Sequence, residues 1–160
     1  KMRKAKDKML INRPYTSAIE DIIHHLSAAS SEYTNKYMCQ RDLKAVGIVV
    51  VATDRGLCAG LNANLFRKIK TAIAAYQKDG VKVQLCALGT KAHSFCKSMN
   101  ADLVASSAHL AEKPVIDEIV GAIDLILAKY AKGEIDKLEI ASNHFVILLC
   151  KNHKLNSFYL

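Results

Sequence analysis

The sequence has no tryptophan and few residues that interrupt regular structure. Its 160 residues include no Trp, two Pro and seven Gly, and aromatic residues make up 6%. So little Pro and Gly argues against a disordered or fibrous chain. The shortage of aromatic side chains disfavours a stacking platform for single-stranded nucleic acid.

Long apolar runs are also missing. The longest are Val46–Ala52 and Phe145–Cys150, and a membrane-spanning helix needs roughly 20 apolar residues. We therefore expect no integral membrane segment. The cysteine count is odd, which favours free thiols in a reducing compartment over a disulfide framework. The cysteines are Cys39, Cys58, Cys86, Cys96 and Cys150.

Charge is concentrated at the start of the chain. The net charge is +8, and the first thirteen residues contain six basic residues and one acidic residue. The basic residues there are Lys1, Arg3, Lys4, Lys6, Lys8 and Arg13. No apolar signal-peptide core follows them. Position 1 is not Met and the last residues carry no stop signal, so we expect a fragment of a longer protein.

The first thirty residues predict a helix. Apolar residues from Met2 to Leu26 recur at a spacing of three and four, which describes one stripe. Pro14 either kinks this helix or begins a second one. The stripe is weak before Ile19, so its first turns need a packing partner. We expect a shaft-like helix over residues 1–30, a linker over 31–45 and a globular domain over 46–160.

From Val46 onward the pattern alternates between strands and helices. We expect strands at 46–52, 81–88, 102–106 and 137–150, the last with a break near Ser142-Asn143, and helices at 61–78, 91–99 and 114–132. The continuous β-branched run at 46–52 predicts a strand that is buried on both faces, and strands joined by helical crossovers are typical of a parallel sheet. The predicted fold class is α/β, with a mostly parallel, doubly wound, Rossmann-like sheet.

The loop after the first strand invites a nucleotide-binding interpretation, because open α/β sheets bind ligands at the carboxyl ends of their strands. The loop lacks the dinucleotide fingerprint, since Gly56 and Gly60 are four residues apart. It also lacks a Walker motif, because Gly60 is followed by Leu61 and Asn62. A further candidate, Gly89-Thr90-Lys91, is too short to hold a phosphate and is expected to make a turn and a helix start. The sequence therefore contains neither the dinucleotide fingerprint nor the Walker motif after the first strand.

Cys58 suggests a second hypothesis, a cysteine-dependent enzyme in which His93 or His144 acts as the base. No spacing requires that arrangement, and a small Cys beside glycines usually packs. No metal site is expected either, because His93 and Cys96 supply only two of the four ligands of a structural zinc. Asp54 is expected to bond the backbone of its own turn, and Arg55 a neighbouring loop.

The ten residues of the loop carry a resemblance to a known family. Thr53, Asp54, Arg55, Gly56, Leu57, Cys58, Ala59, Gly60, Leu61 and Asn62 resemble the signature of the gamma subunit of the rotary ATP synthase. Similarity extends to residues 1–5, 12–15, 136–138 and 142–143. Ala59 departs from the family, which usually has Gly there. The resemblance implies that the family's first residues and its long C-terminal helix lie outside this sequence.

The resemblance implies a non-catalytic rotor in the central stalk, without cofactor or metal. Residues 1–30 would form half of an antiparallel coiled coil. Its basic residues Lys1, Arg3, Lys4 and Lys8 would meet the beta subunits of the catalytic head. The sheet domain would be the foot, in contact with the epsilon subunit and the membrane c ring. Alpha subunits complete the head, and the location implied is the cytoplasmic face of the bacterial inner membrane, without direct membrane insertion.

Nucleic-acid binding by the basic first thirteen residues, which we call the basic arm, is the remaining alternative. A net charge of +5 is enough for salt-sensitive, non-specific binding. No recognised nucleic-acid motif accompanies the arm, so we expect no nucleic-acid partner.

Overall fold

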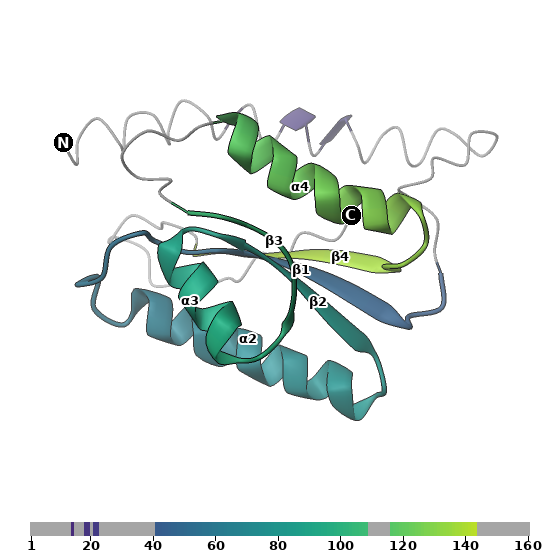
Figure 1. Cartoon of the computed structure of the whole chain (residues 1–160), viewed down its shortest axis with the longest axis horizontal. Coiled ribbons are helices and arrows are strands. Elements are labelled where there is room, and N and C mark those ends of the chain that lie inside the picture. Colours follow the sequence, from purple (N-terminus) through teal and green to yellow (C-terminus); the bar gives the residue numbers. More distant parts are fainter. Residues whose placement is uncertain (1–13, 15–17, 20, 23–40, 109–115, 144–160) are drawn as a thin grey trace. The chain divides into compact units, whose positions relative to one another are not determined.

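The computed structural model describes residues 14, 18–19, 21–22, 41–108 and 116–143 (Figure 1). The chain divides into two units, residues 1–39 and 40–160. In the first unit the described residues are exposed and have helical backbone; they are Pro14, Ala18, Ile19, Asp21 and Ile22. The full helix over 1–30, its coiled-coil pairing and the backbone on either side of Pro14 lie outside the described residues.

The second unit alternates strands and helices as expected. The elements are β1 (Ala45–Val51), α2 (Leu61–Lys78), β2 (Lys82–Leu88), α3 (Thr90–Ser98), β3 (Asp102–Ser107), α4 (Ile116–Ala131) and β4 (Lys137–Ala141). The bounds of α2 are those expected from the sequence. The end of β2 and the starts of β3 and β4 also match, and the other ends that can be compared differ by one residue. Residues 109–115 and 144–150, where the last helix was expected to start and the last strand to continue, are outside the described part.

The four described strands form a parallel sheet in the order β3-β2-β1-β4. This is the order of the first four strands of a Rossmann fold. The order reverses between β1 and β4, so the loops that follow these two strands lie at the topological switch point. The α/β class and parallel sheet expected from the sequence are confirmed.

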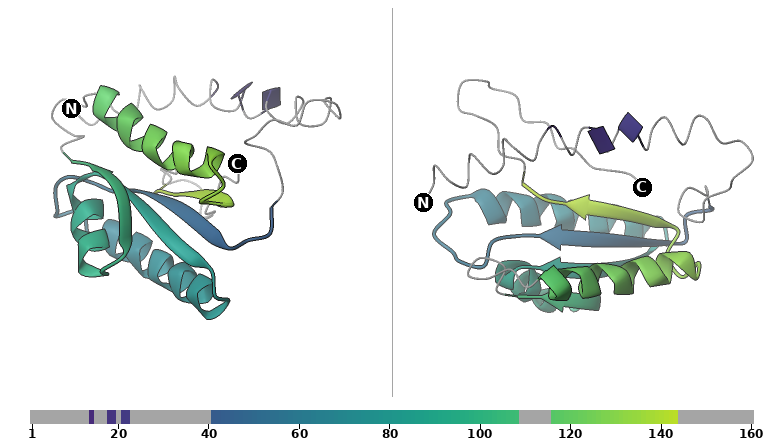
Figure 2. Two further views of the ribbon diagram at one scale, coloured as in Figure 1. Left: turned by 45° about the vertical axis from the view of Figure 1, so that its right-hand side comes forward. Right: turned by 90° about the horizontal axis from the view of Figure 1, so that it is seen from above.

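Helices cover both faces of the sheet (Figures 1 and 2). On one face α2 and α3 pack on Val46, Ile48, Val50, Leu85 and Ala87, through residues that include Leu65, Ile69, Ile73 and Phe95. On the other face α4 packs through Ala122, Ile126 and Tyr130 on Val49, Cys86, Leu88 and Leu138. Alternate side chains of β1 and β2 enter different cores, so Ala45–Val51 and the second half of β2, Leu85–Leu88, are apolar throughout.

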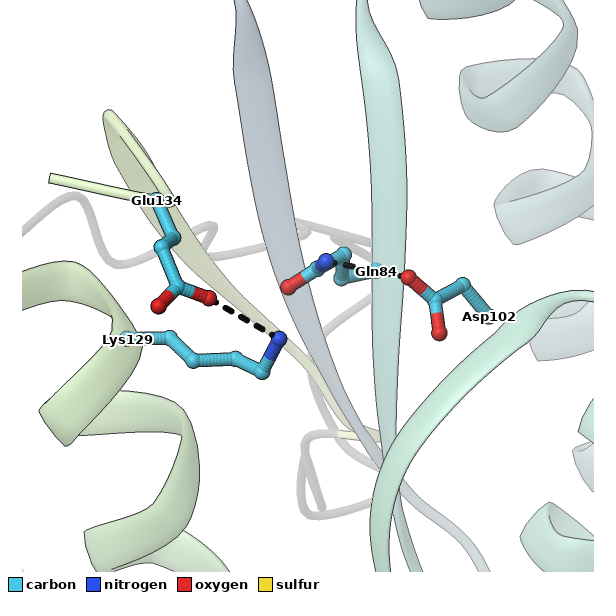
Figure 3. Close-up of polar contacts among 4 residues, drawn as sticks. All are labelled: Gln84, Asp102, Lys129 and Glu134. Carbon is cyan, nitrogen blue, oxygen red and sulfur yellow. Dashed lines mark hydrogen bonds and ion pairs between the residues drawn. The ribbon is translucent and has the colours of Figure 1, made fainter.

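Polar contacts border the core on the α4 side (Figure 3). Gln84 of β2 donates from Nε2 to Asp102 Oδ2 of β3 at 2.9 Å. Lys129, in the last turn of α4, forms an ion pair with Glu134 at 3.1 Å. The positive charge of Lys129 is therefore balanced within its own side of the sheet.

The amino end of the sheet is tied by side chains from distant segments. Asp136 accepts hydrogen bonds from the backbone N–H groups of Lys44 and Ala45, both at 2.9 Å. Tyr76 of α2 donates from its hydroxyl to Glu139 Oε1 of β4 at 2.6 Å. Lys137 pairs with the same oxygen at 2.9 Å. Burial, followed by the hydrogen bond and charge of Glu139, raises the pKa of Tyr76.

Candidate functional site

The signature loop, residues 53–62, leaves the carboxyl end of β1 and leads into α2. The turn after β2, which contains Gly89 and Thr90, lies against it: Lys91 N donates to Thr53 O at 3.1 Å. The segment after β4 also reaches the loop, since Asn143 Nδ2 donates to Leu61 O at 3.4 Å. Three segments that follow three different strands thus meet at the switch point.

A buried amide holds the base of the loop. Asn62, in the first turn of α2, donates from Nδ2 to Thr53 Oγ1 at 2.7 Å and to Cys58 Sγ at 3.3 Å. Thr53 in turn donates its hydroxyl proton to Arg55 O at 2.7 Å. Because that proton is committed, the Thr53 oxygen must accept from Asn62, which fixes the orientation of the amide. The signature residues Thr53, Cys58 and Asn62 therefore form one network.

Asp54 links the loop to α3. Its Oδ1 accepts hydrogen bonds from Thr90 N at 2.9 Å and Thr90 Oγ1 at 3.1 Å. The aspartate thus caps the start of α3 from outside that helix. We expected Asp54 to bond the backbone of its own turn, and this contact with a residue 36 positions away is a different one. The sequence does not show it because the cap comes from another loop.

The first N–H groups of α3 are consequently used by the protein itself. Thr90 N bonds to Asp54 and Lys91 N bonds to Thr53 O. Phosphate-binding helix starts leave such groups free to point at the ligand. The interpretation of Gly89-Thr90-Lys91 as a turn and helix start agrees with this geometry.

Gly89 allows the two loops to approach each other. Its φ is +101°, and a Cβ added there would lie 2.2 Å from Ala52 O. Its N–H donates to Ser107 O at 2.8 Å, and Ala52 N donates to Leu88 O at 2.9 Å. Only glycine fits this position, because any side chain would collide with backbone. The signal for this role in the sequence is a Gly directly after an apolar strand, but the close approach itself depends on a backbone that the sequence does not show.

The tip of the loop is strained and exposed. Leu57 has a φ of 58° and Ala59 a φ of 51°, a left-handed conformation that costs an L-residue about 1–2 kcal/mol. The side chain of Leu57 is fully exposed, and Arg55 is exposed as well. Strain of this kind persists where the surrounding structure imposes it, and it is concentrated at functional sites.

The thiols of the described residues divide into two kinds. Cys86 and Cys96 are fully buried, and burial raises the pKa of each to about 11. Cys58 is half-buried and contacts the amide of Asn62 and the hydroxyl of Thr53. Among the described residues no general base is hydrogen-bonded to Cys58, and His144 lies outside them. The three are free cysteines, as expected.

The other residues that the sequence suggested as functional lie partly outside the described part of the chain. Lys1, Arg3, Lys4 and Lys8 lie outside the described residues. Gly56 and Gly60 flank the loop tip, with the side chain of Lys91 near Gly56. Within the described ranges, no three His, Cys, Asp or Glu residues are arranged to hold a metal ion. The helices found there are also too short or too polar to cross a bilayer.

The fold and loop together define a Rossmann-like domain whose first loop is held by its own side chains and whose tip faces solvent. Comparison with known proteins identifies the family. The family model described as ATP synthase matches residues 1–158. The ATP synthase gamma chain of Nitrosococcus oceani is 40% identical over 146 residues, which are 91% of this chain and 50% of that protein. The chain therefore belongs to the ATP synthase gamma-subunit family, and it spans about half the length of this relative.

Proposed function

We propose that this chain is part of the central-stalk rotor of a proton- or ion-translocating ATP synthase. In this role it performs no chemistry. It transmits torque between the membrane c ring and the catalytic beta subunits by contacting their different states unequally. The observation that carries the proposal is the family match over residues 1–158, which includes the signature loop.

The geometry of the loop supports a mechanical role over a catalytic one. The hydroxyl of Thr53, the Oδ1 atom of Asp54 and the amide nitrogen of Asn62 are engaged with protein atoms, whereas the buried Oδ1 of Asn62 has no hydrogen-bond partner among the described residues. Side chains so committed hold one backbone shape. A loop of fixed shape with an exposed, strained tip suits contact with a neighbouring protein.

The partners follow from the family. We propose contacts of Lys1, Arg3, Lys4 and Lys8 with the catalytic head of alpha and beta subunits, and contacts of the α/β domain with the epsilon subunit and the c ring. The complex would lie at the cytoplasmic face of a bacterial inner membrane, with this chain as a peripheral component. Complementary charge between these basic residues and the catalytic head would affect how the subunits associate and align more than it would affect the stability of the rotor itself.

A cysteine-dependent enzyme is the alternative. It requires a base that removes the proton of Cys58. The described contacts of Cys58 Sγ are with Asn62 and Thr53, and neither an amide nor a hydroxyl can serve as that base. The geometry therefore favours the rotor.

The rotor proposal is tested by a chimera. This chain replaces the matching segment of the Nitrosococcus oceani gamma chain, and the chimera is assembled with the other subunits of that complex. We expect ATP-driven ion pumping, because 40% identity over the segment preserves its fold. Replacing Lys1, Arg3 and Lys4 with Ala should lower pumping relative to ATP hydrolysis.

The matched control replaces Lys68, Lys78 and Lys97, exposed on α2 and α3, with Ala. It removes the same charge from another place and should leave the ratio of pumping to hydrolysis unchanged. A chimera that assembles but does not couple hydrolysis to pumping would contradict the rotor proposal. An unchanged ratio in the Lys1, Arg3 and Lys4 variant would contradict the contact assigned to those residues.

A further inference from the structure

Residues 41–45 lead into β1 and are held by the segment in which α4 ends and β4 begins (Figure 1). They are the end of the linker that the sequence predicts. Arg41 contacts the end of α4, and Asp136 accepts hydrogen bonds from the backbone N–H groups of Lys44 and Ala45, both at 2.9 Å. The N–H of Asp136 in return donates to the carbonyl oxygen of Ala45 at 2.9 Å. The entry to the α/β domain is therefore fixed at two places.

Arg41 is held through several interactions of its guanidinium group. Nη1 donates a hydrogen bond to the carbonyl oxygen of Tyr130 at 3.0 Å, and the guanidinium carbon lies 5.2 Å from the centroid of the Tyr130 ring. Tyr130 is next to the last residue of α4, where positive charge is favourable because the C-terminus of a helix carries partial negative charge. A Cβ added to Gly133 would lie 3.6 Å from Nη1. The turn after α4 therefore lies against the same group.

The residue that Arg41 contacts belongs to the core. Tyr130 is 4% exposed and lies with Ile126 and Leu138 in the core between α4 and the sheet. Its carbonyl oxygen also accepts the N–H of Gly133 at 3.0 Å, which closes the end of α4. A side chain bound to a residue packed in this way moves with the α/β domain. Arg41 thus extends the fixed part of the domain to the start of the described segment.

Without the Arg41 contact, the fixed part of the chain would begin at Lys44. Asp42 and Leu43 are exposed, and within the described segment the next hydrogen bond is the one that Lys44 N donates to Asp136. Three extended residues span about 10 Å, so loss of the contact would free that length of chain. A free chain transmits displacement poorly, because its end-to-end distance changes at little cost in free energy.

We infer that Arg41 is a positioning residue of the rotor, which stiffens the place where the chain enters the α/β domain. The inference rests on the proposed function, because a chain that carries torque needs a stiff entry. Torque that arrives along the chain is delivered through Arg41 to the end of α4, and from there to the core. Lysine is not an equivalent residue, since it lacks the planar group that stacks on a ring while it donates a hydrogen bond.

The test uses the assembled chimera of the rotor proposal, with its catalytic head fixed to a surface and a bead attached to the c ring. Without ATP, the angular variance of the bead measures the torsional stiffness of the rotor. Arg41→Ala should raise this variance about two-fold, because the freed chain resists displacement weakly. Arg41→Lys should raise it less, since positive charge remains at the end of α4. Thermal unfolding of the full chain measures the stability of each variant.

The matched control is Arg67→Ala, which removes the same kind of side chain from an exposed position on α2. Ile73→Val, buried on the inner side of α2, controls for stability, because it lowers the melting temperature at a distance from Arg41. Both controls should leave the angular variance unchanged. In a chimera that pumps ions, an unchanged variance in Arg41→Ala, or an equal rise in either control, would overturn this inference alone. A chimera that assembles but does not pump would overturn the proposed function and this inference with it.

Discussion

At both ends of the parallel sheet an aspartate accepts hydrogen bonds from a distant segment, but the residues with left-handed backbone differ between the amino-end turns and the signature loop. At the amino end Asp136 accepts two backbone N–H groups, and at the carboxyl end Asp54 accepts the N–H and hydroxyl of Thr90. Left-handed residues at the amino end are Gly80, Asn100 and Gly133. These are residue types that tolerate the conformation. The signature loop at the carboxyl end instead uses Leu57 and Ala59.

This difference indicates what each end is built for. Turns at the amino end follow local preferences, so they add stability without strain. The signature loop holds two residues against their preference while its base is fixed by Asn62 and Asp54. A strained, exposed tip on a fixed base is expected where shape serves an interaction. The signature loop therefore gives up some stability to hold its shape, whereas Gly89, at the same end of the sheet, has a positive φ in a residue type that tolerates it.

The largest expected effect on stability comes from adding a Cβ at Gly89, which has backbone close by, and it is compared with the same change at Gly80, which has open space around it. Gly89→Ala should lower the free energy of unfolding by about 3 kcal/mol or more, because its Cβ would meet Ala52 O at 2.2 Å with φ at +101°. Gly80→Ala is the control, since its φ is +75° but nothing lies within 4 Å of the added Cβ. It should cost about 1 kcal/mol. Urea denaturation measures both, and equal losses would contradict the close approach.

The next effect compares the two aspartates. Asp54→Ala and Asp136→Ala should each lower the free energy of unfolding by about 1–3 kcal/mol, because each leaves backbone N–H groups without their acceptor. Asp54→Asn is the conservative control and should cost much less, since an amide oxygen still caps a helix. Thermal unfolding measures the three. If Asp54→Ala were neutral, the loop would not be fixed through α3.

Local pattern was enough to predict much of this fold. The bounds of α2 follow from its apolar spacing and from the Asp79-Gly80 stop. The central strand β1 is a continuous apolar run because both of its faces are covered. The contacts that shape the site are of another kind. Asp54 meets Thr90, and Asn143 meets Leu61, only because β1, β2 and β4 end at the same edge of the sheet.

The sequence identified the signature loop but not the backbone strain within it. The resemblance singled out residues 53–62, but the strain at Leu57 and Ala59 depends on backbone angles that composition does not encode. The sequence showed that Ala59 departs from the family's Gly, but not why Gly is usual there. The structure gives the reason: the position has a φ of 51°, which Gly adopts most easily.

The polar network at the amino end predicts a pH effect. Tyr76→Phe should lower stability at neutral pH by about 1 kcal/mol, because it removes the hydrogen bond to Glu139. Burial and Glu139 raise the pKa of Tyr76, so the unfolded chain loses this proton first as pH rises. Burial lowers the pKa of Lys137, but Glu139 and Tyr76 outweigh it and raise the pKa overall.

Both raised groups stabilise the fold below their unfolded pKa values, and this stabilisation is lost as pH rises through their folded values. Stability of the unmodified chain should therefore fall above about pH 10. The fall should be shallower in Tyr76→Phe. Urea midpoints at neutral and alkaline pH measure the difference. Parallel curves for the two proteins would show that the phenol does not titrate differently in the folded state.

A smaller effect should have the opposite sign. Ala59→Gly should raise the free energy of unfolding by about 0.5–1 kcal/mol, because it removes the left-handed strain of an L-residue. The reciprocal change at the amino end, Gly133→Ala, should lower it by about 1 kcal/mol, since φ there is +76°. Both are measured by thermal unfolding. Destabilisation by Ala59→Gly would mean that the tip is not strained.

The smallest expected effect concerns Cys58. Cys58→Ser should change the free energy of unfolding by less than about 1 kcal/mol, because a hydroxyl can accept the hydrogen bond that Asn62 Nδ2 gives to the sulfur at 3.3 Å. ATP-driven pumping by the chimera should persist for the same reason: the thiol packs and has no described base. Asn62→Ala is the contrasting control, since it removes the donor to both Cys58 and Thr53 and should destabilise more. If Cys58→Ser abolished pumping in a chimera that still assembled, the thiol would have a chemical role, and the signature loop could no longer be regarded as a purely mechanical surface.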